Sequence, residues 1–134
     1  MNAVMGDTTS DADSADKRSR LRRSLSRWAD SGEAHARDLR ATHSVAGDVS
    51  IAEAPDRERV SLRGTIKTVT LRPRGGAPAL EAELEDGSGV ITIVWLGRRR
   101  IAGIGPGRAM RVEGRIGSAT GHRVLFNPRY ELIP

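Results

Sequence analysis

The side chains best suited to chemistry in this sequence are guanidinium groups gathered in two short stretches. Arg72 and Arg74 flank a proline, and Arg98, Arg99 and Arg100 follow one another directly. A guanidinium group is planar, remains charged at neutral pH and presents its donors as a fork that matches phosphate oxygens. It also stacks on aromatic faces. The two stretches therefore predict contacts to the phosphates and bases of a polyanionic chain.

Four further side chains belong to the predicted binding surface. Arg63 and Lys67 are expected to point outward from the first strand of the folded domain, and Arg123 and Trp95 complete the set. Stacking of a base on Trp95 would be worth roughly 1–3 kcal/mol. Alternation along its strand instead places Trp95 on the face of Ile91 and Ile93, which predicts burial. Both interpretations stay open here, as do packing and stacking for the aromatic rings that follow it: Phe126 and Tyr130.

Three acidic side chains argue against a binding surface on the centre of the sheet. Glu81, Glu83 and Glu85 alternate along the second predicted strand, beside Arg63 and Lys67 on the first. Carboxylates facing outward would repel a phosphate chain unless cross-strand pairs neutralise them. Pairing of these glutamates with Arg63 and Lys67 is the favoured interpretation. The loops at the rim are therefore the expected contact surface.

Other kinds of chemistry find no support in the sequence. Cysteine is absent, which excludes disulfides, thiolate metal sites and cysteine nucleophiles. The histidines at positions 35, 43 and 122 do not have the spacing of metal ligands. No grouping of serine, histidine and acidic residue suggests a catalytic triad. The glycines at 103, 105 and 107 precede a strand, so they predict a turn and not a phosphate-binding loop. We expect no metal, no cofactor and no enzymatic activity.

Charge is distributed unevenly along the 134 residues, whose formal net charge is +5. Residues 1–16 hold four aspartates and no basic residue. Residues 17–40 hold eight basic residues against three acidic ones, and residues 55–134 hold fourteen basic residues against eight acidic ones. A basic domain favours nucleic acid or an anionic surface as partner. Because only Lys17 and Lys67 are lysines, mutational bias toward arginine codons is the alternative explanation of the total charge.

The N-terminal third predicts a tail and a helical extension. Residues 1–16 are polar and acidic, which is typical of disorder. In the basic extension and linker, residues 17–54, apolar residues at helical spacing predict a helix over residues 17–29: Leu21, Leu25 and Trp28. Asp30 and Glu33 have the spacing of a capping box, which predicts a second helix to about Ala46. Packing on the domain and docking on a protein partner both suit the helical segment 17–46.

No apolar stretch approaches the roughly 20 residues needed to cross a bilayer, and the chain begins unlike a secretory signal. These features predict a cytoplasmic protein with no membrane contact.

Residues 55–134 change to a period of two. Alternation predicts strands near residues 60–71, 80–85, 90–95, 110–116 and 124–133, with a slip near Thr68 that indicates a bulge. Residues 86–89 (Asp-Gly-Ser-Gly) predict a hairpin turn, and residues 117–122 predict another turn. Residues 96–104 predict a short helical connector, and Pro128 confines the last strand to an edge or a bulge. This order indicates an all-β, five-stranded Greek-key barrel of the OB fold, with a short helix between strands three and four.

The same residues carry a family resemblance. The stretch from Leu80 to Trp95 resembles the strand–turn–strand core of the anticodon-binding OB superfamily. Residues 94–96 and 126–131 resemble the wedge domain of RecG-type branched-DNA helicases. As a whole, residues 55–134 are similar to small actinobacterial OB-fold proteins. No Gly-x-x-x-x-Gly-Lys motif is present, so no helicase motor is expected, and the loop at residues 72–78 lacks the aromatic residue of a wedge.

The resemblance implies a nucleic-acid-binding protein, with DNA favoured over RNA. Together with the arginines it predicts a non-enzymatic protein that binds single-stranded or branched DNA with low sequence specificity. The alternative is a protein-interaction module or accessory subunit that docks through its basic N-terminal helix.

Overall fold

The computed structural model describes residues 27–45 and 47–134. Residues 27–43 are helical. Seven strands follow, namely β1 (Arg59–Leu71), β2 (Ala79–Glu85), β3 (Val90–Leu96), β4 (Ala109–Arg115), β5 (Gly117–Ala119), β6 (His122–Phe126) and β7 (Arg129–Ile133). The predicted acidic tail and the predicted helix up to residue 26 lie outside the described residues. Residues 36–134 pack as one compact unit.

The predicted helix boundary at Asp30 is wrong. Residues 27–43 form one uninterrupted helix, with Asp30 and Gly32 inside it. Glycine in a helix interior costs about 1 kcal/mol relative to alanine, which the hydrogen bonds of the flanking turns outweigh. A capping spacing marks a helix start only where the preceding residues are not already helical.

Among the described residues, no helix has both the length and the apolar composition needed to cross a bilayer.

The first three strands follow the predicted period of two. β1 bends over 13 residues, and its pairing with β2 shifts register between Ile66 and Thr68, which confirms the predicted bulge. β1 pairs with both β2 and β4. Gly64 lies where β1 crosses the end of β2, and a Cβ there would come within 2.7 Å of the Glu85 carbonyl oxygen. Only glycine permits this close approach of two backbones.

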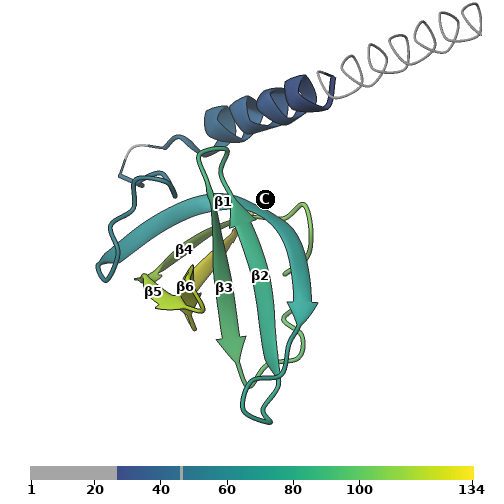
Figure 1. The fold of residues 1–134 in the computed structure, drawn as a ribbon, viewed down its shortest axis with the longest axis vertical. Helices are drawn as coiled ribbons and strands as arrows, with labels where there is room; N and C mark the ends of the chain where they lie inside the picture. The colour runs from purple at the N-terminus through teal and green to yellow at the C-terminus, as the bar shows by residue number, and fades with distance from the viewer. Residues whose placement is uncertain (1–26, 46) are drawn as a thin grey trace, which may run out of the picture. The chain divides into compact units, whose positions relative to one another are not determined.

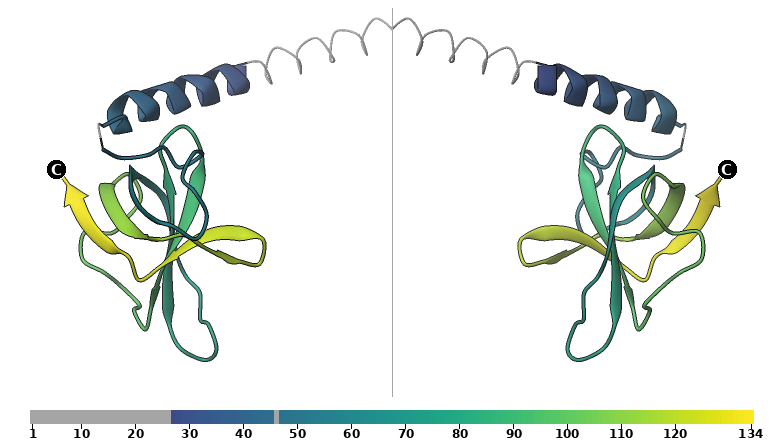
Figure 2. Two further views of the ribbon diagram at one scale, coloured as in Figure 1. Left: turned by 90° about the vertical axis from the view of Figure 1, so that its left-hand side faces the viewer. Right: turned by 90° about the vertical axis from the view of Figure 1, so that its right-hand side faces the viewer.

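The last predicted strand is divided in two, so an unbroken five-stranded barrel is not observed. Asn127 has a positive φ of 47° and precedes Pro128, and this turn separates β6 from β7. β6 pairs parallel with β3, whereas β7 pairs antiparallel with β4. The hydrogen-bonded order is β5-β6-β3-β2-β1-β4-β7. Figure 2 shows β7 and the β5–β6 hairpin on opposite sides of the sheet. The predicted turn at residues 117–122 is this short hairpin.

The predicted helix between the third and fourth strands is also wrong. Residues 97–108 form a series of turns. Gly97 and Gly103 adopt φ values of 76° and 81°, in the left-handed region that interrupts a right-handed helix. The Gly97 N–H donates to the Pro78 carbonyl, which fixes the start of this connector beside the β1–β2 loop.

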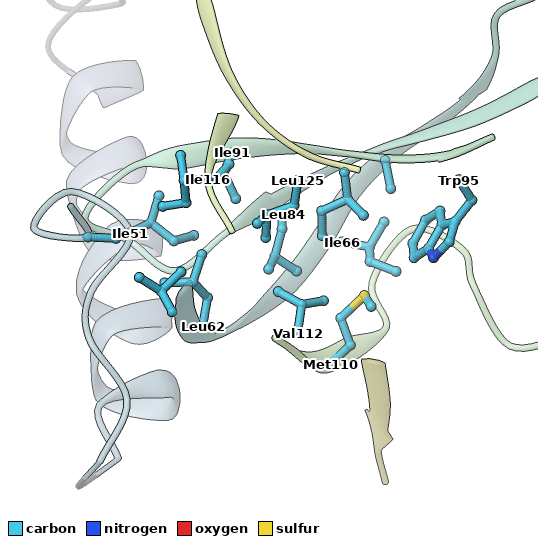
Figure 3. Packing of buried hydrophobic residues seen from close by; sticks show 14 of the residues in the cluster. Ile51, Leu62, Ile66, Leu84, Ile91, Trp95, Met110, Val112, Ile116 and Leu125 are labelled. Atoms are coloured by element: carbon cyan, nitrogen blue, oxygen red, sulfur yellow. The ribbon is translucent and has the colours of Figure 1, made fainter. Parts of the chain in front are cut away.

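The larger of two buried apolar clusters in the described residues is elongated and enclosed by the curved sheet. Figure 3 shows it extending from Ile51 at one end to Trp95 at the other. Leu62, Ile93 and Val112 have no exposed surface. Because these inward positions alternate with polar outward ones, the core fixes which side chains face outward from each strand.

The turn between β2 and β3 contains a buried carboxylate, that of Asp86, which accepts several hydrogen bonds. The Asp86 side chain is 1% exposed and lies 2.8 Å from a guanidinium nitrogen of Arg40. Its carboxylate also accepts hydrogen bonds from the backbone N–H groups of Ile51, Ser88 and Gly89. One carboxylate thereby joins the helix end, the segment before β1 and the hairpin turn.

A buried histidine beside this turn predicts a pH-dependent stability. The Nε2 atom of His43 lies 2.7 Å from the Thr65 hydroxyl. Desolvation lowers the pKa of His43 below its ordinary value, Arg63 and Arg40 lower it further, and Asp86 opposes them. The unfolded chain therefore binds a proton first as the pH falls. We expect the free energy of unfolding to be constant above about pH 6.5 and to decrease below it, toward the folded-state pKa.

Urea unfolding of the wild type and of His43→Gln between pH 8 and pH 5 measures this dependence. His122→Gln, at an exposed position, is the control. Below pH 6.5 the wild type and the control should lose stability, while His43→Gln should lose clearly less. Parallel profiles for all three proteins would contradict the assignment to His43.

Candidate functional site

Two arginine-bearing loops meet at one end of the sheet. The β1–β2 loop, residues 72–78, and the connector, residues 97–108, leave adjacent strands, because Ala79 pairs with Leu96. The hydrogen bond from the Gly97 N–H to the Pro78 carbonyl, 2.8 Å long, joins them directly. Figure 1 shows the β1–β2 loop and the end of β3 together at the lower end of the view. Four of the exposed arginines in these loops are termed the arginine rim: Arg72, Arg98, Arg99 and Arg100.

Arg72 and Arg74 have different surroundings although only one residue separates them. The Arg72 side chain is 71% exposed and lies 3.9 Å from Glu81. Arg74 donates to Glu81 Oε1 over 2.7 Å and lies 5.6 Å from the centre of the Phe126 ring. Arg74 is thus held by an acid and an aromatic face, whereas Arg72 remains accessible for a phosphate.

Strand register arranges the outward side chains in rows across β1, β2, β3 and β6. In the first row Thr70 lies opposite Glu81, Glu81 opposite Val94, and Val94 opposite Phe126. Arg74 contacts both Glu81 and Phe126, on either side of Val94, which has no exposed surface. This row is therefore closed to a ligand unless Arg74 moves.

The second row lies open. Thr68 is opposite Glu83, and Glu83 is opposite Thr92. A groove of 190 Å³ lies over this row, with Arg72 and His122 also in its wall. A neighbouring hollow of 420 Å³ shares three of its residues: Glu83, Thr92 and His122. The groove thus combines hydroxyl groups and carboxylates with the exposed guanidinium of Arg72.

Three predicted site residues lie away from the arginine rim. Arg63 is opposite Arg111 on β4, and Lys67 occupies the bulge of β1 and has no partner in the β2 ladder. Arg123 donates to the backbone carbonyls of Ile51 and Ala54 and to Asp56. Arg123 therefore holds the segment before β1 against the hairpin and is not available to a ligand.

The strand register does not place Arg63 or Lys67 opposite the glutamates of β2. The residues opposite Glu81, Glu83 and Glu85 on β1 are threonines: Thr70, Thr68 and Thr65. The bulge changes the phase of β1, so the threonines, and not the basic residues, come to lie opposite the carboxylates. Glu81 is neutralised from the β1–β2 loop instead.

Trp95 is buried, as the alternation along β3 indicates. Its side chain is 5% exposed and meets the Tyr130 ring edge-on, with 5.7 Å between ring centres. It offers no face to a base. Phe126 is 43% exposed, but the guanidinium of Arg74 lies over its ring.

The described residues contain no group of three or more histidine or acidic side chains arranged to hold a metal ion.

Neither a family model nor a curated protein matches this sequence. Among solved structures, the OB domain of Ta0387 from Thermoplasma acidophilum superimposes with a TM-score of 0.52 and 19% identity, over 63% of this chain and 85% of that one. The fold is an OB fold. This confirms the fold family expected from the strand order.

Two further structures share the OB fold with this chain. The p204 HINb domain matches with a TM-score of 0.52 and 17% identity, over 64% of this chain and 47% of that one. RecG bound to a three-way DNA junction matches with a TM-score of 0.50 and 20% identity, over 64% of this chain and 12% of that one. The chain thus spans about half of the first protein and a small part of the second. At these identities the likeness establishes the fold.

Proposed function

We propose that this chain is a non-enzymatic nucleic-acid-binding protein whose arginine rim contacts the phosphates of a single strand. The observation that carries the proposal is the gathering of four exposed guanidinium groups at one end of the OB sheet, beside an open groove. In the OB fold, oligonucleotides commonly bind across strands two and three and the loops beside them. One of the structures that share this fold supports the proposal, because it is of RecG bound to a three-way DNA junction.

Single-stranded and forked DNA are the proposed ligands. A strand that follows the arginine rim meets Arg72 and the connector arginines, and such phosphate contacts position a nucleic acid without reading its sequence. The glutamates of β2 keep phosphates away from the centre of the outer face, because like charges repel. The sugar-phosphate chain is therefore expected at the rim, with bases turned toward the groove.

Fluorescence anisotropy with labelled oligonucleotides tests this function. Single-stranded DNA, forked DNA and RNA of the same sequence are titrated at about 50 and 200 mM salt, the range over which phosphate contacts are strongly salt-dependent. If four phosphates are neutralised on a single strand, log K should fall with log salt with a slope near −3. The absence of binding to all three at the lower salt concentration would falsify the proposal.

The alternative is a protein partner bound through the basic segment at residues 17–46. Residues 17–26 and 46 of that segment lie outside the described residues, whereas the arginine rim lies wholly within them. The titration separates the two, because a protein-docking module has no reason to bind oligonucleotides with a steep salt dependence.

A further inference from the structure

The row formed by Thr68, Glu83 and Thr92 has unsatisfied hydrogen-bonding capacity. Glu83 lies opposite both threonines, one on each neighbouring strand. Within residues 27–45 and 47–134 none of the three side chains forms a hydrogen bond or an ion pair. Glu81, two residues away, is engaged by Arg74 over 2.7 Å. An unpaired carboxylate is unexpected in a chain with 22 basic residues and 17 acidic ones.

This row of side chains lies in a concave part of the protein surface. The groove over it measures 190 Å³ and is bounded by Arg72 and His122. Glu83 is only partly exposed, and hydroxyl groups stand on both sides of it. A ligand in the groove therefore meets a carboxylate acceptor between two hydroxyls that can donate, with a guanidinium in the wall.

The chemistry of the row selects one kind of base edge. An ionised carboxylate has two oxygens that only accept hydrogen bonds. Guanine presents two adjacent donors on its Watson–Crick edge, the N1–H and the 2-amino group, next to the O6 acceptor. Adenine and cytosine present one amino donor beside a ring-nitrogen acceptor, and thymine presents one N–H between two carbonyls. Only guanine matches both carboxylate oxygens while O6 accepts from a neighbouring hydroxyl.

We propose that the groove over Thr68, Glu83 and Thr92 binds an unpaired guanine of a strand whose phosphates lie along the arginine rim. The inference rests on the proposed function and adds a base preference to it. Glu83 accepts from N1–H and the 2-amino group, and a threonine hydroxyl donates to O6. Proteins that bind single strands commonly read splayed bases through this edge. Arg72, in the wall of the same groove, links the base pocket to the phosphate contacts.

The test compares oligonucleotides that differ at one position. Labelled single strands of equal length carry one central guanine, inosine or adenine in an otherwise thymine sequence. Inosine lacks the 2-amino group and keeps N1–H and O6. A bidentate contact to a base is worth about 1–3 kcal/mol of discrimination, so the guanine strand should bind about tenfold more tightly than the inosine strand.

Two charge-matched variants assign the preference to the groove. Glu83→Gln keeps the size of the side chain and replaces one acceptor oxygen by a donor, so the guanine and inosine strands should bind equally well. Glu131→Gln removes the same charge at an exposed position on the edge strand β7 and should retain the tenfold preference. Equal unfolding midpoints of the two variants verify that both are folded.

The outcomes separate this inference from the function on which it rests. Equal binding of guanine, inosine and adenine strands by the wild type would overturn the guanine site and leave the arginine rim in place. A preference that survives in Glu83→Gln would also overturn it. Failure of every oligonucleotide to bind would remove both proposals. Binding of an arginine-rich peptide, with no binding of any oligonucleotide, would remove them as well.

Discussion

Replacing Asp86 with alanine should lower the free energy of unfolding by about 3–5 kcal/mol, the cost of breaking a buried ion pair. The change removes the acceptor for three backbone N–H groups and for the guanidinium of Arg40. The Ile51 N–H is buried, so no water replaces the lost carboxylate there. Since domains of this size have only about 5–15 kcal/mol of stability, the variant is expected to be marginally folded at room temperature.

Urea unfolding followed by tryptophan fluorescence measures the loss, and Glu113→Ala is the matched control. Glu113 also belongs to an acid–arginine pair, but the pair with Arg59 is 4.0 Å long and both side chains are largely exposed. Exposed pairs of this kind contribute about 0–1 kcal/mol. If the two substitutions cost the same, Asp86 does not join the three segments in the way described.

The parts of the fold that local sequence determines were predictable. The Asp86–Gly89 turn and the alternation on both sides of it define the β2–β3 hairpin without reference to the rest of the chain. The bulge near Thr68 shows in the sequence because the apolar phase itself changes there. In both places a short-range pattern and the tertiary structure require the same conformation.

Other features depended on interactions between distant residues. The connector after β3 carries residues that suit a helix, but the Gly97 N–H donates to the Pro78 carbonyl in the β1–β2 loop and the helix does not form. The sequence predicts one last strand that Pro128 confines to an edge or a bulge, whereas Asn127 bonds to Val94 and Leu96 and divides this strand in two. Neither partner can be identified from the residues near the break.

The candidate site was predictable in its loops and not on its sheet. Loops run over the surface, and Arg72 and the three connector arginines are exposed there, whereas Arg74 of the same loop is held by Glu81. The partners of Glu83 depend on the register of three strands, and a shift of one residue on β1 would replace Thr68 by Lys67 or Val69 opposite it. Arg123 was misplaced for the same reason, because its backbone acceptors lie about 70 residues away.

Removing the three connector arginines should weaken nucleic-acid binding strongly and reduce its salt dependence. The helix expected from the sequence would have spread Arg98, Arg99 and Arg100 around an axis, but they lie in an exposed loop where successive side chains can follow one strand. Each phosphate contact to a single strand contributes about 0.7 to the salt slope. The triple alanine variant should therefore have a slope shallower by about 2, which at about 0.1 M salt amounts to roughly 100-fold weaker binding.

A second triple variant separates the position of the charges from their number. Arg37, Arg59 and Arg115 are exposed. Arg59 and Arg115 lie opposite each other in the β1–β4 ladder, at the start of β1 and so at the opposite end of that strand from Arg72. Replacement of all three arginines by alanine removes the same charge and should leave the salt slope within about one contact, or 0.7, of the wild type. Anisotropy titrations of both variants from about 50 to 200 mM salt give the two slopes directly. Equal losses in the two variants would mean that overall charge attracts the strand and that the arginine rim has no special part in binding it.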